Sequence, residues 1–242
     1  MTDQPGAVAA DGLAGVVWHP SPNFGPRRDG LTPRLIVLHY TQMADARQAL
    51  ERLCDPDAAV SAHYLIGACG TVWQLVEERA RAWHAGAGSW RGQEDVNSRS
   101  IGIELDNDGA SPFAAPLMLA LERLLPAIRR RWAIPPEGVI AHSDMAPTRK
   151  ADPGPRFDWR RLALRGDAVW PAPGMAAGRA ETSLAASLDR LGYPPVSPDE
   201  RLRAFRLRFR PGATGPETAT DRALAAALAE GELLRKSAQV YE

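Results

Sequence analysis

The stretch Arg34-Leu-Ile-Val-Leu-His39 is a short apolar run that ends in a histidine, and it decides how the rest of the sequence is interpreted. Such a run is typical of a buried β-strand. Ser100-Ile-Gly-Ile-Glu-Leu105 predicts a second strand, in which Glu104 faces away from its apolar neighbours. Val139-Ile-Ala-His142 predicts a short third strand that again ends in a histidine. We therefore expect a sheet with polar groups at its strand ends.

Helical and strand patterns alternate around these three strands. Residues 45–53 (DARQALERL) carry leucines at helical spacing, and residues 116–132 have an apolar stripe and an arginine-rich end, so both predict helices. Residues 62–67 and 70–76 indicate two strands around a glycine-containing turn, which predicts a hairpin. The expected fold is a mixed α/β fold with a central mixed β-sheet flanked by helices.

Composition divides the chain into four parts. All five histidines and six of the seven tryptophans fall within residues 16–165, where we expect the α/β domain. Residues 1–15 predict a flexible lead, and residues 166–180, rich in Ala, Gly and Pro, predict a linker. Residues 181–242 contain no His, Trp or Cys and predict a small C-terminal domain of three helices.

The three C-terminal helices are expected at residues 181–193, 199–210 and 218–238. In the second helix Leu202, Phe205 and Phe209 share one face, while arginines occupy the other. The arginine face fits either ligand binding or a solvated surface. Because a unit of about 60 residues is marginal alone, we expect it to dock on the first domain.

The charge balance excludes partners that are held by bulk electrostatics. The 242 residues include 29 basic and 29 acidic side chains, so the chain lacks the basic footprint of a nucleic-acid-binding protein. No apolar run approaches the length of a membrane span. The N-terminus lacks the charged start and apolar core of a secretory signal, which predicts a cytoplasmic protein, with a periplasmic one as the alternative. Cys54 and Cys69 predict free thiols and no disulfide framework.

Three polar residues at or after the predicted strand ends could hold a metal ion. His39 and His142 end two strands, and Asp152 follows His142 by ten residues in a loop rich in Pro and Gly. Two imidazoles and one carboxylate leave one zinc position open for water, as in catalytic sites. The spacing also fits polar residues that are simply hydrogen-bonded at strand ends.

Two further residues could carry chemistry beside such a metal. Glu104, flanked by Ile and Leu, is either a partly desolvated base or a residue on a solvated strand face. Lys150 is one of only two lysines among the 29 basic residues, and it precedes Asp152 by two positions. Its ammonium is either a group that stabilises an oxyanion near the metal or an ordinary loop lysine.

Five blocks of sequence occur in a fixed order. They are Leu38-His39-Tyr-Thr, Ser61-Ala-His-Tyr-Leu-Ile66, Ala82-Trp-His-Ala-Gly86, Asn97-Ser-Arg-Ser-Ile-Gly-Ile-Glu104 and Ala141-His-Ser-Asp-Met-Ala-Pro-Thr-Arg-Lys-Ala-Asp-Pro-Gly-Pro155. Together they resemble the zinc-dependent N-acetylmuramoyl-L-alanine amidases of the amidase-2 family, which share their fold with peptidoglycan recognition proteins. The resemblance extends from about Trp18 to Trp159. The C-terminal region, through Leu-Gly-Tyr-Pro and Phe-Arg-Leu-Arg-Phe-Arg-Pro, resembles the peptidoglycan-binding domain of longer members.

The resemblance implies a zinc-dependent amidase with one Zn²⁺ per chain, which cleaves the bond between N-acetylmuramic acid and L-alanine. The zinc ligands would be His39, His142 and Asp152. Glu104 would move the proton, and Lys150 would stabilise the oxyanion. His84 and Asn97 are candidate substrate contacts.

The expected ligand is a muropeptide or a peptidoglycan fragment, and we favour soluble anhydro-muropeptides in cell-wall recycling. An exported amidase that remodels the wall is one alternative. A peptidoglycan recognition protein that binds without cutting is another. A scaffolding module with packed histidines is a third.

Overall fold

The computed structural model describes residues 14–172 and 181–231, and its centre is a mixed β-sheet. Six strands lie in the order β1-β5-β4-β7-β3-β8; the β4–β5 pair is antiparallel and the other four pairs are parallel. The predicted mixed sheet and its hairpin are therefore confirmed. The strands are β1 (Val16–Trp18), β3 (Leu35–Tyr40), β4 (Tyr64–Ile66), β5 (Val72–Gln74), β7 (Ser100–Leu105) and β8 (Val139–Ala141), with β2 (Phe24–Gly25) and β6 (Arg81–Ala82) in a separate small sheet.

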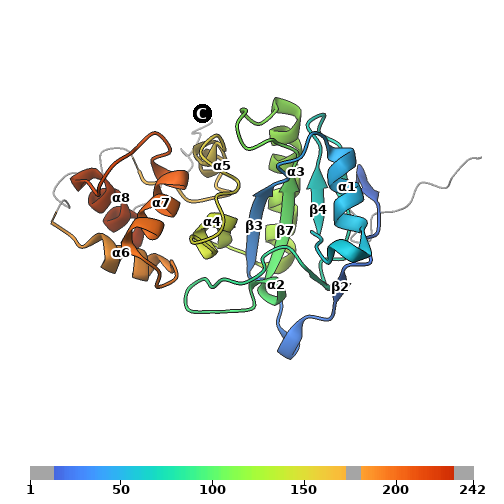
Figure 1. Ribbon diagram of the computed structural model, residues 1–242, viewed down its shortest axis with the longest axis horizontal. Helices are drawn as coiled ribbons and strands as arrows, with labels where there is room; N and C mark the ends of the chain where they lie inside the picture. The colour runs from blue at the N-terminus through green and yellow to red at the C-terminus, as the bar shows by residue number, and fades with distance from the viewer. Residues whose placement is uncertain (1–13, 173–180, 232–242) are drawn as a thin grey trace, which may run out of the picture.

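Helices lie on both faces of the sheet and at one end of the molecule. Figure 1 shows α6, α7 and α8 together at that end, with α4 and α5 between them and the sheet. None of the helices in the described ranges has both the length and the apolar character needed to cross a membrane. The helices are α1 (Ala46–Cys54), α2 (Val96–Arg99), α3 (Ala115–Trp132), α4 (His142–Met145), α5 (Trp159–Leu164), α6 (Leu184–Leu191), α7 (Pro198–Phe209) and α8 (Ala219–Ala229).

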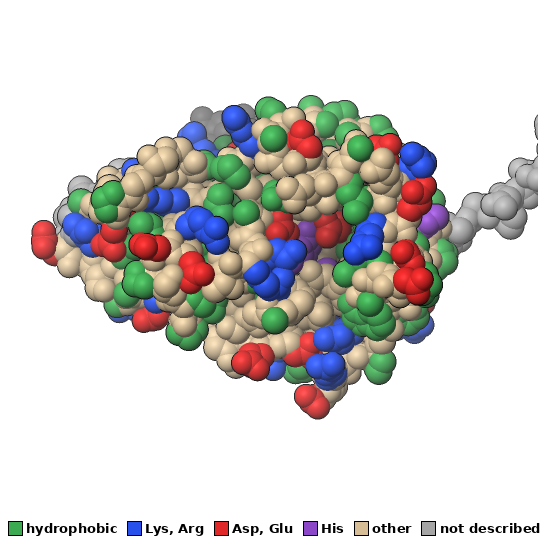
Figure 2. Space-filling model, in the orientation of Figure 1, with side chains coloured by type: hydrophobic (Ala, Val, Ile, Leu, Met, Phe, Trp, Pro, Cys, Tyr) green, Lys and Arg blue, Asp and Glu red, His purple; other side chains and the backbone are tan. Residues whose placement is uncertain are grey.

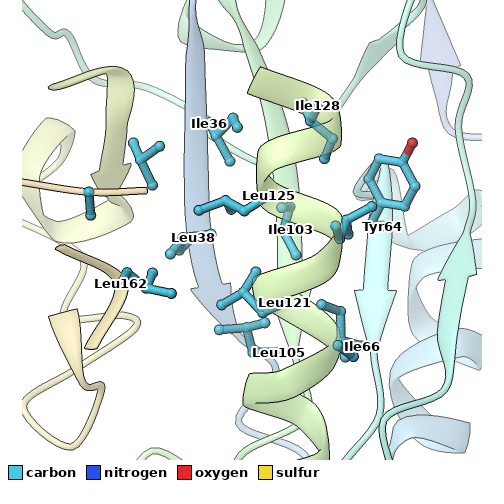
Figure 3. Packing of buried hydrophobic residues seen from close by; sticks show 14 of the residues in the cluster. Ile36, Leu38, Tyr64, Ile66, Ile103, Leu105, Leu121, Leu125, Ile128 and Leu162 are labelled. Carbon is cyan, nitrogen blue, oxygen red and sulfur yellow. The ribbon is translucent and has the colours of Figure 1, made fainter. Parts of the chain in front are cut away.

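Helix α3 covers one face of the sheet and forms the main core with it. Every second residue of the central strands points to this helix, because side chains alternate along a strand. Leu121 and Leu125 of α3 thereby meet Ile103 of β7 and Leu38 of β3, and all four side chains are fully buried (Figure 3). Burial of each such side chain stabilises the fold by about 1.5–3 kcal/mol, so this contact fixes the strand register.

The opposite face of the sheet is covered in two parts. Leu65 of β4 packs with α1, whereas Val37 of β3 and Ile140 of β8 pack with residues of the C-terminal helices. His39 and Glu104 lie on this second face, because they alternate with residues that face α3. The strip of sheet between the two covers is where the candidate site lies.

The C-terminal helices dock on the first domain through apolar and buried polar contacts. Leu202, Phe205 and Phe209 of α7 are buried, as their spacing predicts. The sequence predicted that the arginine face of this helix binds a ligand or is solvated. Neither explanation fits Arg206 and Arg208, because both side chains are buried. Each of these arginines meets a buried carboxylate, so the energetic penalty of taking a charge out of water is offset by pairing.

The Arg208 ion pair ties α7 to the loop that carries the candidate metal ligands. Arg208 donates to Asp144 of α4 at 2.6 Å and to the Val139 carbonyl at 3.1 Å. The Tyr193 hydroxyl donates to the other oxygen of Asp144 at 2.8 Å, and the Ala141 N–H donates to Asp144 at 2.9 Å. Helix α4 begins at His142, so this network holds the backbone of a predicted ligand.

Several predicted boundaries differ from the structure or lie outside the described residues. Helix α8 ends at Ala229 and is followed by a turn at Glu230 and Gly231, and residues 232–238 of the predicted third helix lie outside the described residues. Residues 166–172 of the predicted linker are packed, and Ala168 joins the core under α3. Most of the expected lead (1–13), residues 173–180 and residues 232–242 are not among the described residues. Cys54 and Cys69 are free thiols, as predicted.

Candidate active site

Neighbouring strand ends bring the predicted site residues together. In the parallel register His39 of β3 lies beside Glu104 of β7, and β8 pairs with β3 up to Ala141, one residue before His142. Asp152 returns to the same place because its carbonyl accepts a hydrogen bond from the Ser143 N–H at 3.0 Å. Residues far apart in sequence thus share one end of the sheet.

These residues lie in a cleft of about 440 Å³. Figure 2 shows it as a hollow on the face of the molecule, with histidine and acidic side chains inside and basic side chains beside it. Its wall includes Arg52, Trp83 and Arg149. A charged cleft of this size suits a polar ligand larger than a single amino acid.

Three potential ligand atoms meet at one point of the cleft. The Nδ1 atoms of His39 and His142 lie 2.8 Å apart, and each lies 2.9 Å from Oδ2 of Asp152. All three side chains are buried, and among the described residues they form a group of His, Cys, Asp or Glu able to hold a metal ion. Two nitrogens and one carboxylate oxygen match a zinc site that keeps a position open.

The hydrogen bonding of His142 tests whether this group fits a cation. His142 Nε2 lies 2.9 Å from the Ala85 carbonyl oxygen, which can only accept, so Nε2 carries the hydrogen. Arg149 also lies close to this nitrogen, but it donates to the carbonyls of Ala85 and Ala87. In the neutral ring the Nδ1 atom of His142 therefore carries a lone pair that faces the Asp152 carboxylate. Two facing acceptors need a cation, or a hydrogen on His39, between them.

Burial keeps His39 neutral near pH 7. Loss of hydration, and then the neighbouring His142, lowers the pKa of His39 to about 4. A metal ligand must offer a lone pair, and a neutral imidazole does so without first losing a proton. The ring is thus prepared for a metal over most of the physiological pH range.

Glu104 has the environment of a catalytic base. Its Oε2 is buried and has no hydrogen-bond partner among the described residues. Burial, and then the Asp152 carboxylate, raises the pKa of Glu104 well above its ordinary value, while Lys150 opposes this shift. A carboxylate that is not stabilised by donors binds a proton readily, which is what proton transfer requires.

Lys150 lines the cleft on the loop between His142 and Asp152. Its backbone N–H donates to the Ala146 carbonyl at 3.0 Å, which fixes the loop. The Lys150 charge acts on both His39 and Glu104. Lys150 and Asp152 thus line the same cleft, and the role of Lys150 in stabilising an oxyanion stays a prediction.

His84 lines the cleft, and Asn97 contacts it from behind the cleft wall. The side-chain oxygen of Asn97 accepts from the backbone N–H groups of His84 at 3.0 Å and Ala85 at 2.8 Å. His84 lines the cleft, and its Nδ1 lies 3.0 Å from Nε2 of His39. Burial, and then His39, lowers the pKa of His84 well below its ordinary value. Asn97 is buried and positions the loop, so a substrate contact from it stays a prediction.

Sequence reasoning missed several residues that shape the site. Arg149 joins two loops through the Ala85 and Ala87 carbonyls, and Arg52 reaches the cleft from α1. Arg149 could have been predicted as a site residue, because it directly precedes Lys150 in the block of residues 141–155. Arg52 could not, since nothing in its own helix indicates which sheet edge the helix covers. His63 lies directly before β4, is buried, and accepts from the Gly102 N–H through its Nδ1 at 3.0 Å.

Comparison with known proteins identifies the architecture that carries this site. The family model described as N-acetylmuramoyl-L-alanine amidase matches residues 29–155, which contain all five predicted zinc and catalytic residues. The chain belongs to the N-acetylmuramoyl-L-alanine amidase family. As an amidase it is an enzyme, which decides against the binding-only and scaffolding alternatives.

Some relatives of this amidase match most of the chain, and others match a smaller part of it. The amidase AmiD of Escherichia coli K12 is 40% identical over 230 residues, with 81% of this chain and 82% of AmiD covered. The 1,6-anhydro-N-acetylmuramyl-L-alanine amidase AmpD of Enterobacter cloacae is 34% identical over 160 residues, with 59% of this chain and 86% of AmpD covered. The structure of E. coli AmiD in complex with the substrate anhydro-N-acetylmuramic acid-L-Ala-D-gamma-Glu-L-Lys has a TM-score of 0.75 and 37% identity, and it covers 88% of this chain and 93% of that one.

Proposed function

We propose that this amidase uses one Zn²⁺, held by His39, His142 and Asp152, to cleave the bond between N-acetylmuramic acid and L-alanine in soluble anhydro-muropeptides. The observation that carries the proposal is the meeting of three ligand atoms beside the unpartnered carboxylate of Glu104. That combination supplies a Lewis acid and a base at one point.

Amide hydrolysis is slow because the carbonyl is a weak electrophile and the amine a poor leaving group. Zinc, when bound, polarises the carbonyl and lowers the pKa of a water to about 7. Glu104 takes the proton from the attacking water and passes it to the departing nitrogen, a role that its raised pKa suits. The Lys150 ammonium stabilises the negative charge that develops on the carbonyl oxygen.

The preference for soluble fragments rests on the relatives. AmpD relatives are named for the 1,6-anhydro sugar, and AmiD has been captured with an anhydro-muropeptide. We extend this to the present chain and place its action in cell-wall recycling in the cytoplasm, with His84 on the cleft wall as a substrate contact. Export to act on the wall is the alternative, and amidase activity confined to a periplasmic fraction would favour it.

We also propose that residues 16–165 form the amidase domain and residues 181–242 a peptidoglycan-binding-like domain, joined by residues 166–180. The supporting observation is that Leu184 of α6, Phe205 of α7 and Leu228 of α8 meet in one buried cluster, which also includes Val37 and Ile140 of the sheet. Binding of sacculi by the full chain carrying Glu104→Ala, which is expected to be inactive, tests the binding role without cleavage.

The proposal as a whole is tested by metal analysis and product analysis. Elemental analysis of purified protein should give about one zinc per chain. Incubation with anhydro-muropeptides should yield the free peptide by mass spectrometry, and intact sacculi should yield little. Full activity in a metal-free preparation would refute the mechanism, and release from sacculi alone would refute the recycling role.

A further inference from the structure

His84 lies directly behind His39, on the side away from Asp152. His39 Nε2 lies 3.0 Å from His84 Nδ1, and His84 Nε2 lies 3.2 Å from the Ser100 hydroxyl. The Ser100 hydroxyl in turn lies 2.6 Å from the Val96 carbonyl oxygen. A continuous chain of polar groups thus runs from a backbone carbonyl to the ring that faces the candidate metal site.

The direction of every hydrogen bond in this chain follows from its first member. A carbonyl oxygen only accepts, so at 2.6 Å the Ser100 hydroxyl must give its hydrogen to Val96. The Ser100 oxygen can then only accept, and the hydrogen between it and His84 belongs to His84 Nε2. A neutral imidazole carries one such hydrogen, so His84 Nδ1 is a lone pair.

The hydrogen bond between His84 and His39 has a fixed direction too. Since His84 Nδ1 only accepts, the hydrogen between the two rings belongs to His39 Nε2. His39 Nδ1 is therefore a lone pair, and it points at His142 Nδ1 and Asp152 Oδ2. With His142 oriented by the Ala85 carbonyl, all three atoms that meet in the cleft are acceptors. The arrangement calls for a cation, because no hydrogen remains to lie between them.

The ring of His84 is held in place on three sides. Its backbone N–H donates to Asn97, and its ring packs edge-on against His39 and His63 at centroid distances of 5.1 and 5.7 Å. Beneath it is Gly102, where a Cβ atom would come within 2.4 Å of the His84 ring. The absence of a side chain at Gly102 gives the ring its place between the strand and His39.

We propose that Ser100 and His84 are positioning residues that fix the tautomer of His39 and so prepare its Nδ1 for the metal. The inference rests on the metal site of the proposed function and extends it to two residues outside the ligand set. His39 and His142 are then oriented differently: His142 by a single carbonyl, and His39 by a relay through two side chains. Groups that orient a ligand in this way typically change metal affinity by about 10–100-fold when they are removed.

The variants that test the relay differ in whether they restore its acceptor. His84→Ala removes the acceptor for His39 Nε2–H, whereas in His84→Asn the side-chain oxygen takes the place of Nδ1. Ser100→Ala removes the group that fixes His84. Ser98→Ala is the matched control, because Ser98 is a buried serine nearby that accepts from the Arg28 N–H and has no part in the relay.

Two measurements are needed, Zn²⁺ affinity by competition with a chromogenic chelator and the His39 tautomer by ¹H–¹⁵N NMR of the metal-free protein. We expect the Nε2–H tautomer in the wild type, in Ser98→Ala and in His84→Asn, all with similar affinity. His84→Ala and Ser100→Ala should mix the tautomers and bind zinc about 10–100-fold more weakly.

Three results would overturn the relay: an Nδ1–H tautomer of His39 in the wild type, unchanged affinity in both His84→Ala and Ser100→Ala, or His84→Asn as weak as His84→Ala. If His84→Ala does not fold, the zinc affinity and His39 tautomer of Ser100→Ala, compared with those of Ser98→Ala, decide whether the relay exists. Failure of the wild type to bind zinc would refute the metal site itself, and the His39 tautomer of the metal-free protein would still decide the relay.

Discussion

Replacement of Arg208 by Met should destabilise the whole molecule, because it leaves the charge of Asp144 buried. The Arg208 side chain is 3% exposed and that of Asp144 is fully buried, with 2.6 Å between the paired atoms. After the change Asp144 keeps only two neutral donors, the Tyr193 hydroxyl and the Ala141 N–H. Methionine preserves most of the apolar stem, so the effect measures the lost charge more than lost packing.

The expected cost is about 3–5 kcal/mol, the range for breaking a buried pair by removing one partner. Against a total stability of about 5–15 kcal/mol, that is a large fraction. Urea unfolding followed by tryptophan fluorescence measures it, and Trp159 makes a good probe because the Arg208 guanidinium lies 4.1 Å from its ring centre. The double variant Asp144→Asn, Arg208→Met should recover much of the loss, since it leaves no unpaired charge.

The matched control is Arg203→Met on the same helix. Arg203 is exposed and donates to the Pro147 carbonyl at the surface, so its replacement should cost about 1 kcal/mol or less. An Arg208→Met variant no more destabilised than this control would refute the claim that the buried charge of Asp144 needs Arg208. A double variant as unstable as Arg208→Met alone would refute it too.

Four further predictions concern the site itself. His142→Ala should lose both zinc and activity; zinc retained in elemental analysis would contradict the ligand assignment. Glu104→Gln should keep zinc and lose turnover. It should also make the metal-free protein more stable above the ordinary glutamate pKa, because the raised pKa of native Glu104 means that the unfolded chain loses this proton first; a stability equal to wild type in urea unfolding at pH 8 would contradict this. The metal-free wild type should lose stability as the pH falls from about 6.5, the pKa of an unfolded histidine, toward about 4, the pKa of His39 in the folded protein. In that window the unfolded chain binds more protons than the folded one, and protonation therefore favours unfolding. A flat profile of unfolding free energy against pH would contradict this. Gly102→Ala should displace His84 and weaken zinc binding, and an unchanged affinity would show that the ring position is not critical.

The sequence predicted the sheet, and it placed the candidate site residues at strand ends, because both depend on local patterns. Apolar runs that end in His39 and His142 place those residues at strand ends, and parallel strands bring their ends together. The alternation in residues 100–105 correctly turned Glu104 away from the core under α3. The face of the sheet on which a residue lies can therefore be predicted from the alternation of side chains along its strand.

What could not be predicted depends on contacts between distant segments. The arginines of α7 look like a solvated face, because nothing in residues 199–210 reveals that Asp144 and Asp221 meet them. Ser100 looks like the first residue of a strand, and its part in orienting His39 follows only from three distances in the folded chain. Charged and hydroxyl side chains take their roles from partners that periodicity does not identify.

The shared cluster beneath α6, α7 and α8 has a consequence for protein engineering. Val37 and Ile140 belong to the strands that present His39 and His142, yet their side chains are covered by the C-terminal helices. A shortened chain would expose this apolar strip, and a hybrid enzyme built by exchanging residues 181–231 would need a matching apolar face and a counterpart of Arg208 for Asp144. The helical unit therefore covers part of the same sheet face that presents His39, and it cannot be exchanged freely.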